Sequence, residues 1–161
     1  MIICGYQGIG KSTLSNADNK CIDLESGNFW IDGKRQDNWY MIYCNIAIEL
    51  SKQGYVVFLS SHKVVRDYLA SLPKTEDIYV VCPSANLKDE WITKLEARYN
   101  ATNLEKDYKA WKNAEQCYLD NINELMFGGL PCYVIKDMKY DLKAIVNWLK
   151  GSDSEWVIFL G

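Results

Sequence analysis

The stretch that decides the fold is Gly5-Tyr6-Gln7-Gly8-Ile9-Gly10-Lys11-Ser12-Thr13, which directly follows the short apolar run Met1–Cys4. It fits the pattern G-x-x-x-x-G-K-[ST] without a mismatch, and the residues after it are compatible with a helix. Between a strand and a helix, such a loop turns its backbone N–H groups inward, where they bind phosphate oxygens at the positive end of the helix. The sequence therefore predicts a phosphate-binding loop here.

Each residue type in this loop has a chemical role. Glycines allow the tight turn that brings the backbone N–H groups together. We expect Lys11 to reach the β- and γ-phosphates of ATP and the Ser12 hydroxyl to bind Mg²⁺, while Thr13 helps to seat the helix. The predicted phosphate-binding residues are Gly5, Gly8, Ile9, Gly10, Lys11, Ser12 and Thr13.

Composition excludes several classes of protein. A length of 161 residues is typical of one domain, and we expect a single one over residues 1–161. The net charge of −3 argues against a general binder of nucleic acid or membrane surfaces. The sequence has neither a signal peptide nor a run of roughly 18 apolar residues, so we expect a cytoplasmic protein without a membrane span.

Six cysteines and one histidine are the possible soft metal ligands of the chain. The cysteines lie in or beside predicted strands and helices, and no C-x-x-C pair occurs. A zinc site therefore does not fit the spacing. We predict reduced, mostly structural thiols, as in the cytosol.

Short apolar runs alternate with helix-like segments along the chain. The predicted strands are Met1–Cys4, Lys20–Leu24, Tyr55–Ser60, Asp77–Cys82, Cys132–Ile135 and Glu155–Leu160. The predicted helices are Lys11–Asn16, Asn38–Lys52, His62–Ser71, Leu87–Tyr99, Glu105–Met126 and Leu142–Leu149. This alternation indicates an α/β fold with a parallel sheet covered by helices on both faces. Because ligands of such sheets bind at the carboxyl ends of the strands, the residues just after each strand are the candidates.

Two carboxylates follow the second predicted strand. Asp23 and Glu25 are two residues apart, so alternation places them on the same side. Facing a phosphate loop, they can hold Mg²⁺ through water or orient an acceptor hydroxyl. We expect Asp23 to act in metal binding and catalysis and Glu25 in substrate binding; a helix cap or a solvated turn is the simpler alternative.

The third predicted strand is followed by Ser60-Ser61-His62. Phosphate-loop enzymes usually carry a second Mg²⁺-associated acid at this position, and here there is none. Either a serine holds the metal's water or Asp23 takes that duty. His62 is compatible with capping and packing as well as with catalysis, and the two serines are compatible with capping the next helix.

Only three of the 18 basic residues are arginines: Arg35, Arg66 and Arg98. Arginine is the residue suited to planar, bidentate recognition of phosphate. We predict Arg35 and Arg66 as substrate ligands, and Arg66 and Arg98 as catalytic groups. Lys94 lies one turn before Arg98 and is also predicted to contact substrate, with an ion pair to Glu90 as the alternative.

Two polar stretches, Asn28–Asp37 and Asn100–Glu105, have the weakest pattern and are predicted to be mobile. Aromatic residues gather around the first of them, and these either pack in the core or stack on a base. They are Phe29, Trp30, Trp39, Tyr40 and Tyr43.

With these features, the chain resembles the nucleoside-monophosphate kinase-like group of phosphate-loop kinases, and the small deoxynucleoside monophosphate kinases of phages in particular. The resemblance rests on Gly5–Thr13, Asp23-x-Glu25, Ser61-His62…Arg66, Leu87–Arg98 and Tyr133–Leu142. It implies a three-layer P-loop NTPase fold with a five-stranded parallel sheet in the order 2-3-1-4-5. It also implies a flap over about residues 26–45, a lid over about residues 94–108 that closes over ATP, and an adenine site near Asp137–Lys139.

The expected reaction is ATP-Mg-dependent phosphoryl transfer to a nucleoside or deoxynucleoside monophosphate, with a nucleotide donor and a small-molecule acceptor as the only partners. The oligomeric state stays open. One alternative keeps the fold but changes the acceptor to a small-molecule hydroxyl or a polynucleotide 5′-end, with Asp23 and Glu25 as base and orienting group. Another is a regulatory protein that binds or hydrolyses nucleotide without being a kinase.

Overall fold

The computed structural model describes residues 1–73, 77–151 and 158–159. Within them, six strands form one parallel sheet in the order β2-β5-β1-β6-β7-β8. These strands are β1 (Ile2–Gly5), β2 (Cys21–Asp23), β5 (Val56–Ser60), β6 (Ile78–Pro83), β7 (Cys132–Ile135) and β8 (Ile158–Phe159). Of the last predicted strand, only residues 158–159 lie among the described residues.

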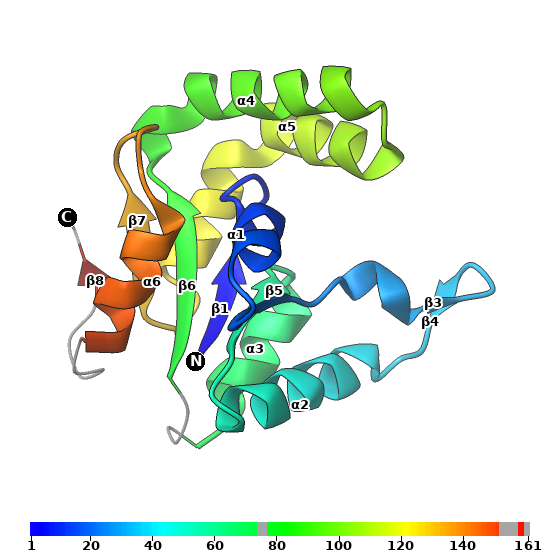
Figure 1. Cartoon of the computed structure of the whole chain (residues 1–161). Coiled ribbons are helices and arrows are strands. Elements are labelled where there is room, and N and C mark those ends of the chain that lie inside the picture. The colour runs from blue at the N-terminus through cyan, green and yellow to red at the C-terminus, as the bar shows by residue number, and fades with distance from the viewer. Residues whose placement is uncertain (74–76, 152–157, 160–161) are drawn as a thin grey trace.

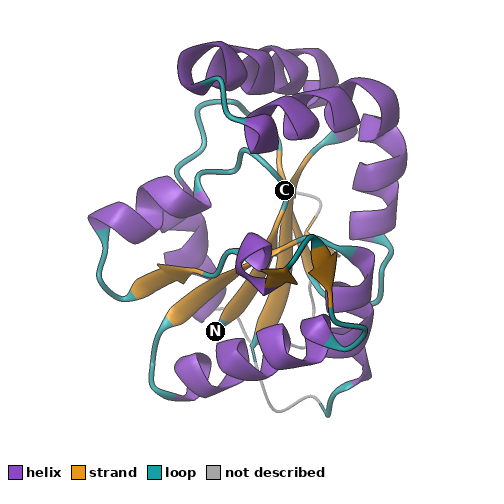
Figure 2. Ribbon diagram, turned by 90° about the vertical axis from the view of Figure 1, so that its right-hand side faces the viewer, coloured by secondary structure: helices purple, strands orange, loops and turns teal. Residues whose placement is uncertain are grey.

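Helices cover both faces of this sheet. They are α1 (Lys11–Ala17), α2 (Trp39–Lys52), α3 (Lys63–Ser71), α4 (Lys88–Thr102), α5 (Glu105–Met126) and α6 (Leu142–Gly151), with short 3₁₀ turns η1 (Ser26–Phe29) and η2 (Ala85–Leu87). Helices α1 and α6 contact each other on one face, and α2, α3 and the second half of α5 lie on the other (Figure 1, Figure 2). The predicted α/β fold, its parallel sheet and its helices on both faces are confirmed.

The core is built on continuous apolar strands. Val57, Phe58 and Leu59 of β5 are fully buried, as are Val81 and Cys82 of β6. Central parallel strands are buried on both faces, which is why their sequences show no alternation. Burying each large apolar side chain contributes roughly 1.5–3 kcal/mol. This packing fixes β1 between β5 and β6, so the segment after Gly5 leaves from the middle of the carboxyl edge.

The sheet differs from the predicted five strands numbered 2-3-1-4-5. The flap contains a separate hairpin, β3 (Trp30–Ile31) with β4 (Lys34–Arg35), and β8 adds a sixth strand beside β7. Asp32 and Gly33, with φ values of +49° and +75°, close the hairpin in a two-residue turn. Strands of two residues are too short to show alternation, so the periodicity of the sequence did not indicate them.

Helices α4 and α5 form an antiparallel pair over the carboxyl edge of the sheet (Figure 1). Of the stretch Asn100–Glu105, for which mobility is predicted, only residues 103–104 lie between helices, because α4 runs to Thr102 and α5 begins at Glu105. Asn103, with φ of +52°, ends α4. Helix α5 has non-helical backbone angles at Cys117, and this kink lets its two halves pack separately against α4 and the sheet.

None of the helices in the described part of the chain is long and apolar enough to cross a membrane.

Candidate functional site

The loop Gly5–Thr13 leaves the end of β1 and enters α1. Gly8 and Gly10 have φ values of +85° and +101°, in the left-handed region that favours glycine. At Gly5 a Cβ atom would lie 2.5 Å from Ile9 Cδ1 and 2.9 Å from Lys11 Cδ. The backbone therefore favours glycine at positions 8 and 10, and a side chain at position 5 would crowd those of Ile9 and Lys11.

The first turn of α1 presents N–H groups that no carbonyl within the helix accepts. Leu14 is the first residue of α1 whose N–H bonds back along the helix, to Gly10 O at 3.0 Å. The ammonium of Lys11 lies 2.9 Å from Gly5 O, folded across the loop. Burial lowers the pKa of Lys11, and the nearby carboxylates of Asp23 and Glu25 oppose that shift. Together, the N–H groups and Lys11 form a positive concavity that suits an anion.

Ser12 and Asp23 are brought together as predicted for a metal site. Ser12 Oγ donates a hydrogen bond to Asp23 Oδ2 at 2.7 Å. Neighbouring ligands of an octahedral Mg²⁺ lie about 2.9 Å apart, so this spacing fits two oxygens around one ion. Residues 1–73, 77–151 and 158–159 contain no cluster of three or more His, Cys, Asp or Glu side chains. The remaining ligands would therefore come from water or phosphate.

Glu25 lies apart from this pair. Strand β2 ends at Asp23, and the chain turns into η1, which breaks the expected alternation. Glu25 Oε1 lies 3.6 Å from Lys106 Nζ, and both side chains are more than half exposed. Asp23 thus faces α1, whereas Glu25 faces α5.

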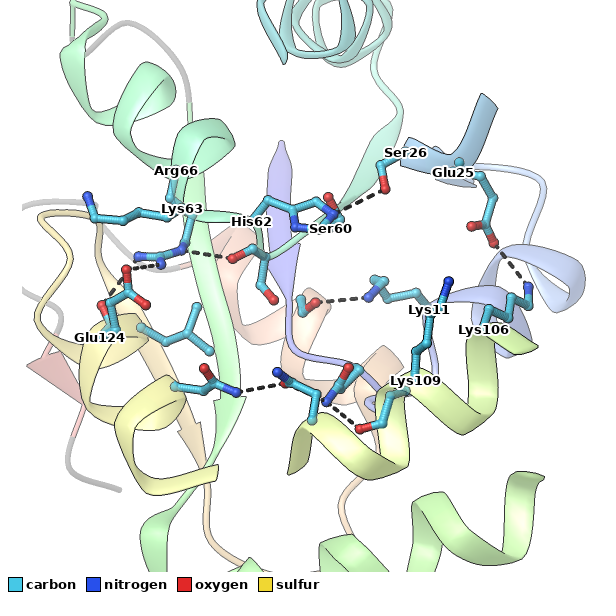
Figure 3. Close-up of a pocket in the computed structure, with 18 of the residues that line it drawn as sticks. Lys11, Glu25, Ser26, Ser60, His62, Lys63, Arg66, Lys106, Lys109 and Glu124 are labelled. Carbon is cyan, nitrogen blue, oxygen red and sulfur yellow. Dashed lines mark hydrogen bonds and ion pairs between the residues drawn. The ribbon is translucent and has the colours of Figure 1, made fainter. Parts of the chain in front are cut away.

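Two cavities open beside Lys11. The first, here called the α6-side cavity, has a volume of about 860 Å³ and lies between the loop, α4 and the start of α6. The second, here called the flap-side cavity, has a volume of about 690 Å³ and lies between the flap, α3 and α5 (Figure 3). Of the described residues that line them, Lys11 alone belongs to both. Met138, in the middle of the predicted adenine segment, lines the α6-side cavity.

Both cavities are strongly cationic, although the whole chain carries a net charge of −3. The ionic groups of the α6-side cavity are Lys11, Lys94, Arg98 and Lys143 against Asp141. Those of the flap-side cavity are Lys11, Arg35, Lys63, Arg66, Lys106 and Lys109 against Glu25 and Glu124. Such an excess of positive charge raises the local concentration of anionic ligands.

Arg66 lines the flap-side cavity but is almost entirely buried. Only 2% of its surface is exposed. Its Nη2 lies 3.2 Å from Glu124 Oε1, and its Nε donates to Ser61 O at 3.0 Å. Figure 3 shows the guanidinium turned toward Glu124. These partners fix the orientation of Arg66 before any ligand binds.

Arg98 and Arg35 are also held by the protein. Arg98 Nη2 lies 2.7 Å from Asp107 Oδ1, at the connection of α4 and α5, and Arg98 lines the α6-side cavity. Arg35 Nη2 donates to Ser26 Oγ at 3.2 Å, and its guanidinium lies 4.1 Å from the centre of the Trp39 ring. Each predicted arginine therefore reaches a cavity with part of its donor set already used.

Lys94 is turned toward the aromatic rings of the α6-side cavity. Its Nζ lies 4.4 Å from the centre of the Trp91 ring and 4.9 Å from that of Tyr140, and it donates to Tyr140 Oη at 2.8 Å. Burial lowers the pKa of Lys94, and the charge of Arg98 adds to that shift.

The segment after β5 contributes polar groups to the flap-side cavity. Ser60 Oγ is buried and has no hydrogen-bond partner among the described residues. His62 Nε2 lies 3.4 Å from Ser26 Oγ, and the ring contacts the face of Trp39 edge-on. Burial, then the charges of Arg35 and Lys11, lowers the pKa of His62, which favours the neutral ring at pH 7. The Ser60 hydroxyl and the neutral ring of His62 thus lie at the carboxyl end of β5, where phosphate-loop enzymes usually carry an acid.

Sequence reasoning missed the contribution of α5 to this cavity. One face of the helix lines it with polar side chains: Lys106, Lys109, Asn113, Asn121 and Glu124. Their spacing of three, four and eight residues matches one side of a helix, and this was the available signal. The sequence could not show which other element this side faces. Trp30 of the flap hairpin, 55% exposed, also lines the cavity.

Comparisons of the chain with protein-family models and with curated proteins give no match. The chemistry of the site is therefore derived from its own geometry.

Proposed function

We propose that this chain is a kinase that transfers the γ-phosphoryl group of ATP to the phosphate of a nucleoside or deoxynucleoside monophosphate. One observation carries the proposal: Lys11 lies where two cationic cavities meet, and each cavity is large enough for a nucleotide. A chain that only bound nucleotide would need one such cavity. Two that share a lysine support transfer between two anions.

The α6-side cavity is the proposed donor site. ATP with Mg²⁺ would supply the transferable phosphoryl group and a partly neutralised phosphate chain. Lys11 and the N–H groups at the start of α1 would bind the phosphates, and Ser12 with Asp23 would hold the metal. Arg98, at the outer end of α4, would offset charge on the transferring group. These residues act by positioning and charge rather than by covalent chemistry.

The flap-side cavity is the proposed acceptor site. Arg66, Lys106 and Lys109 would bind the acceptor phosphate. A hydroxyl acceptor needs a carboxylate as base, but Asp23 does not line the flap-side cavity and accepts a hydrogen bond from Ser12. The excess of positive side chains in this cavity supports a phosphate acceptor.

The fold is consistent with this assignment. When only the strands of the main sheet are numbered, the flap hairpin drops out of the count, and the first five run in the order typical of three-layer phosphate-loop kinases. This order supports the P-loop NTPase fold. The end of the α4–α5 pair, near residues 94–108, is the proposed lid, and the segment over residues 26–45 is the proposed flap.

The test is an acceptor panel. The protein is incubated with ATP and Mg²⁺ alone, then with each nucleoside and deoxynucleoside monophosphate, with small hydroxyl acceptors and with a 5′-hydroxyl oligonucleotide, and ADP is measured. We expect ADP formation that depends on a monophosphate. ADP formed equally without acceptor would indicate a hydrolase, and ATP binding without any ADP would indicate a binding protein. Either result would contradict the proposal.

A further inference from the structure

Three carbonyl groups of the loop are engaged by two aromatic side chains that lie outside the motif. Trp91 of α4 donates its indole N–H to Gln7 O at 2.9 Å. The hydroxyl of Tyr140, just before α6, lies 2.9 Å from Ile9 O and 3.3 Å from Gly8 O. These donors come from segments more than 80 residues further along the chain.

Hydrogen bonds to these carbonyls restrict the orientation of the loop's peptide groups, and this orientation decides which N–H groups can bind an anion. In a planar trans peptide the C=O and the N–H point in opposite directions. Fixing a carbonyl therefore fixes the direction of the next N–H: Gln7 O sets that of Gly8 and Ile9 O that of Gly10, whereas the Ile9 N–H already donates to Tyr6 O at 3.4 Å. A carbonyl that rotated inward would instead present negative charge to a phosphate and remove a donor.

We propose that Trp91 and Tyr140, here called the aromatic clamp, are positioning residues that keep the loop in its anion-binding conformation. This inference rests on the proposed function, in which the loop binds the phosphates of ATP. It assigns the two residues no contact with the reacting atoms.

Lys94 determines which way the Tyr140 hydroxyl points. A tyrosine has one O–H to donate, and its oxygen also accepts hydrogen bonds. Because Lys94 donates to that oxygen at 2.8 Å, the proton of Tyr140 is directed to the loop carbonyls. Burial raises the pKa of Tyr140 to about 12, so the phenol keeps its proton at neutral pH. The rings of Trp91 and Tyr140 stack at 5.8 Å, which joins the two halves of the aromatic clamp.

Close packing at Gly8 supports the same role. A Cβ atom on Gly8 would lie 2.9 Å from Leu95 Cδ2 and 3.3 Å from Trp91 Nε1. Helix α4 therefore lies directly against the backbone of the loop. The Trp91 half of the aromatic clamp is therefore part of the close packing between α4 and the loop.

Tyr140→Phe tests the aromatic clamp, because it removes one oxygen and leaves the ring stack. Tyr118→Phe is the control for loss of a tyrosine–carbonyl hydrogen bond: Tyr118 donates to Ser84 O at 2.8 Å, and this carbonyl lies outside the loop. Tyr140 lines the α6-side cavity, whereas Trp91 lines neither cavity, so Trp91→Phe tests the loop without removing a group from the cavity. Binding of ATP and of inorganic tripolyphosphate is measured by calorimetry, melting temperature by thermal unfolding, and the Michaelis constants of donor and acceptor by kinetics.

Tyr140→Phe is expected to raise the Kd of ATP and of tripolyphosphate about tenfold, the upper range for one hydrogen bond. The KM of the donor should rise together with the Kd of ATP, while the KM of the acceptor should not change. Tyr118→Phe should lower the melting temperature by about as much as Tyr140→Phe does, but it should leave the Kd values of ATP and tripolyphosphate unchanged. Trp91→Phe, which removes only the indole N–H and part of the ring, should behave like Tyr140→Phe.

The outcomes separate the two claims. If the wild-type protein binds ATP and tripolyphosphate and Tyr140→Phe binds them equally well, the aromatic clamp has no positioning role. If the wild-type protein binds neither, the proposed function fails and the clamp loses its purpose with it. If Trp91→Phe does not fold, Tyr140→Phe alone decides.

Discussion

The two cavities that meet at Lys11 differ in how the sequence specifies them. The part of the α6-side cavity that is proposed to bind phosphate comes from consecutive residues, Gly8–Leu14, in one strand–loop–helix unit. The flap-side cavity is assembled from the flap, α3 and α5, which are far apart in the chain. A local motif carries its geometry in its own backbone, whereas an assembled cavity depends on how separate elements pack. Residues of the proposed donor side can thus be recognised by their spacing in the sequence, and those of the proposed acceptor side only in the structure.

Lys11 belongs to both cavities, so its loss should have the largest effect. Lys11→Ala is expected to lower kcat by about 10²-fold or more, because it removes a charge aimed at the developing charge of the transition state. Steady-state kinetics with saturating ATP and acceptor measures it. Lys20→Ala, which removes a lysine that lies against Tyr55 instead of the site, is the control. Near-normal turnover in Lys11→Ala would remove the loop from the mechanism.

Asp23 allows the donor side to be tested separately. Asp23→Asn keeps the shape of the side chain but removes its charge, so the Mg²⁺ concentration for half-maximal activity should rise roughly 10–100-fold. A magnesium titration of the wild type, Asp23→Asn and Ser12→Ala measures it. The acceptor KM should not change. An unaltered magnesium requirement would place the metal away from this pair.

Arg66 tests the acceptor side. Arg66→Ala is expected to raise the acceptor KM about tenfold while the Kd of ATP stays constant, because Arg66 lines only the flap-side cavity. It should also lower stability by about 2 kcal/mol, less than for a fully buried pair because Glu124 is 42% exposed. Glu124→Gln keeps the guanidinium and removes its partner. If both variants change the kinetics equally, Arg66 acts through structure alone.

Helix α5 offers a smaller test with an internal control. Lys106→Gln and Lys109→Gln should each raise the acceptor KM by about 3–10-fold, since each removes one exposed charge near the proposed phosphate. Lys112 lies on the same helix but lines neither cavity, and its Nζ lies 3.8 Å from the centre of the Trp111 ring. Lys112→Gln should therefore leave the acceptor KM unchanged. A uniform effect of all three lysines would indicate only a general loss of positive charge.

The sequence predicted what depends on local spacing. The apolar runs located β1, β5, β6 and β7 within one or two residues, and the bounds of α5 were predicted without error. The pairing of Ser12 with Asp23 also followed from their places at the ends of adjacent elements. The kink at Cys117 and the hairpin β3–β4 were missed, because their causes lie in packing and in a turn with positive φ.

The fate of the arginines shows the other limit of sequence reasoning. All three arginines line a cavity, but their phosphate roles stay predictions, and two of them are held by carboxylates of α5. Glu124 fixes Arg66 from 58 residues further along the chain, and no spacing rule links such distant positions. Asp107 lies only nine residues after Arg98, but their ion pair depends on how the chain turns between α4 and α5. Tertiary contacts, rather than composition, decide how much of each guanidinium remains for a ligand.

Cys4 gives the smallest and simplest test, because it lies in β1 directly before the loop. It is fully buried, and burial raises the pKa of its thiol to about 12, although the charges of Arg66 and Lys11 oppose the shift. At pH 8 only about one thiol in 10⁴ would be ionised, against roughly one in ten for an unshifted group. Iodoacetamide at pH 8, followed by mass spectrometry, should therefore label the partly exposed Cys117 well before Cys4. In urea, which unfolds the chain, the labelling rates of Cys4 and Cys117 should become similar. Labelling of Cys4 in the native protein as fast as Cys117 would mean that the end of β1, from which the loop leaves, is open to solvent, and would contradict the burial of this strand.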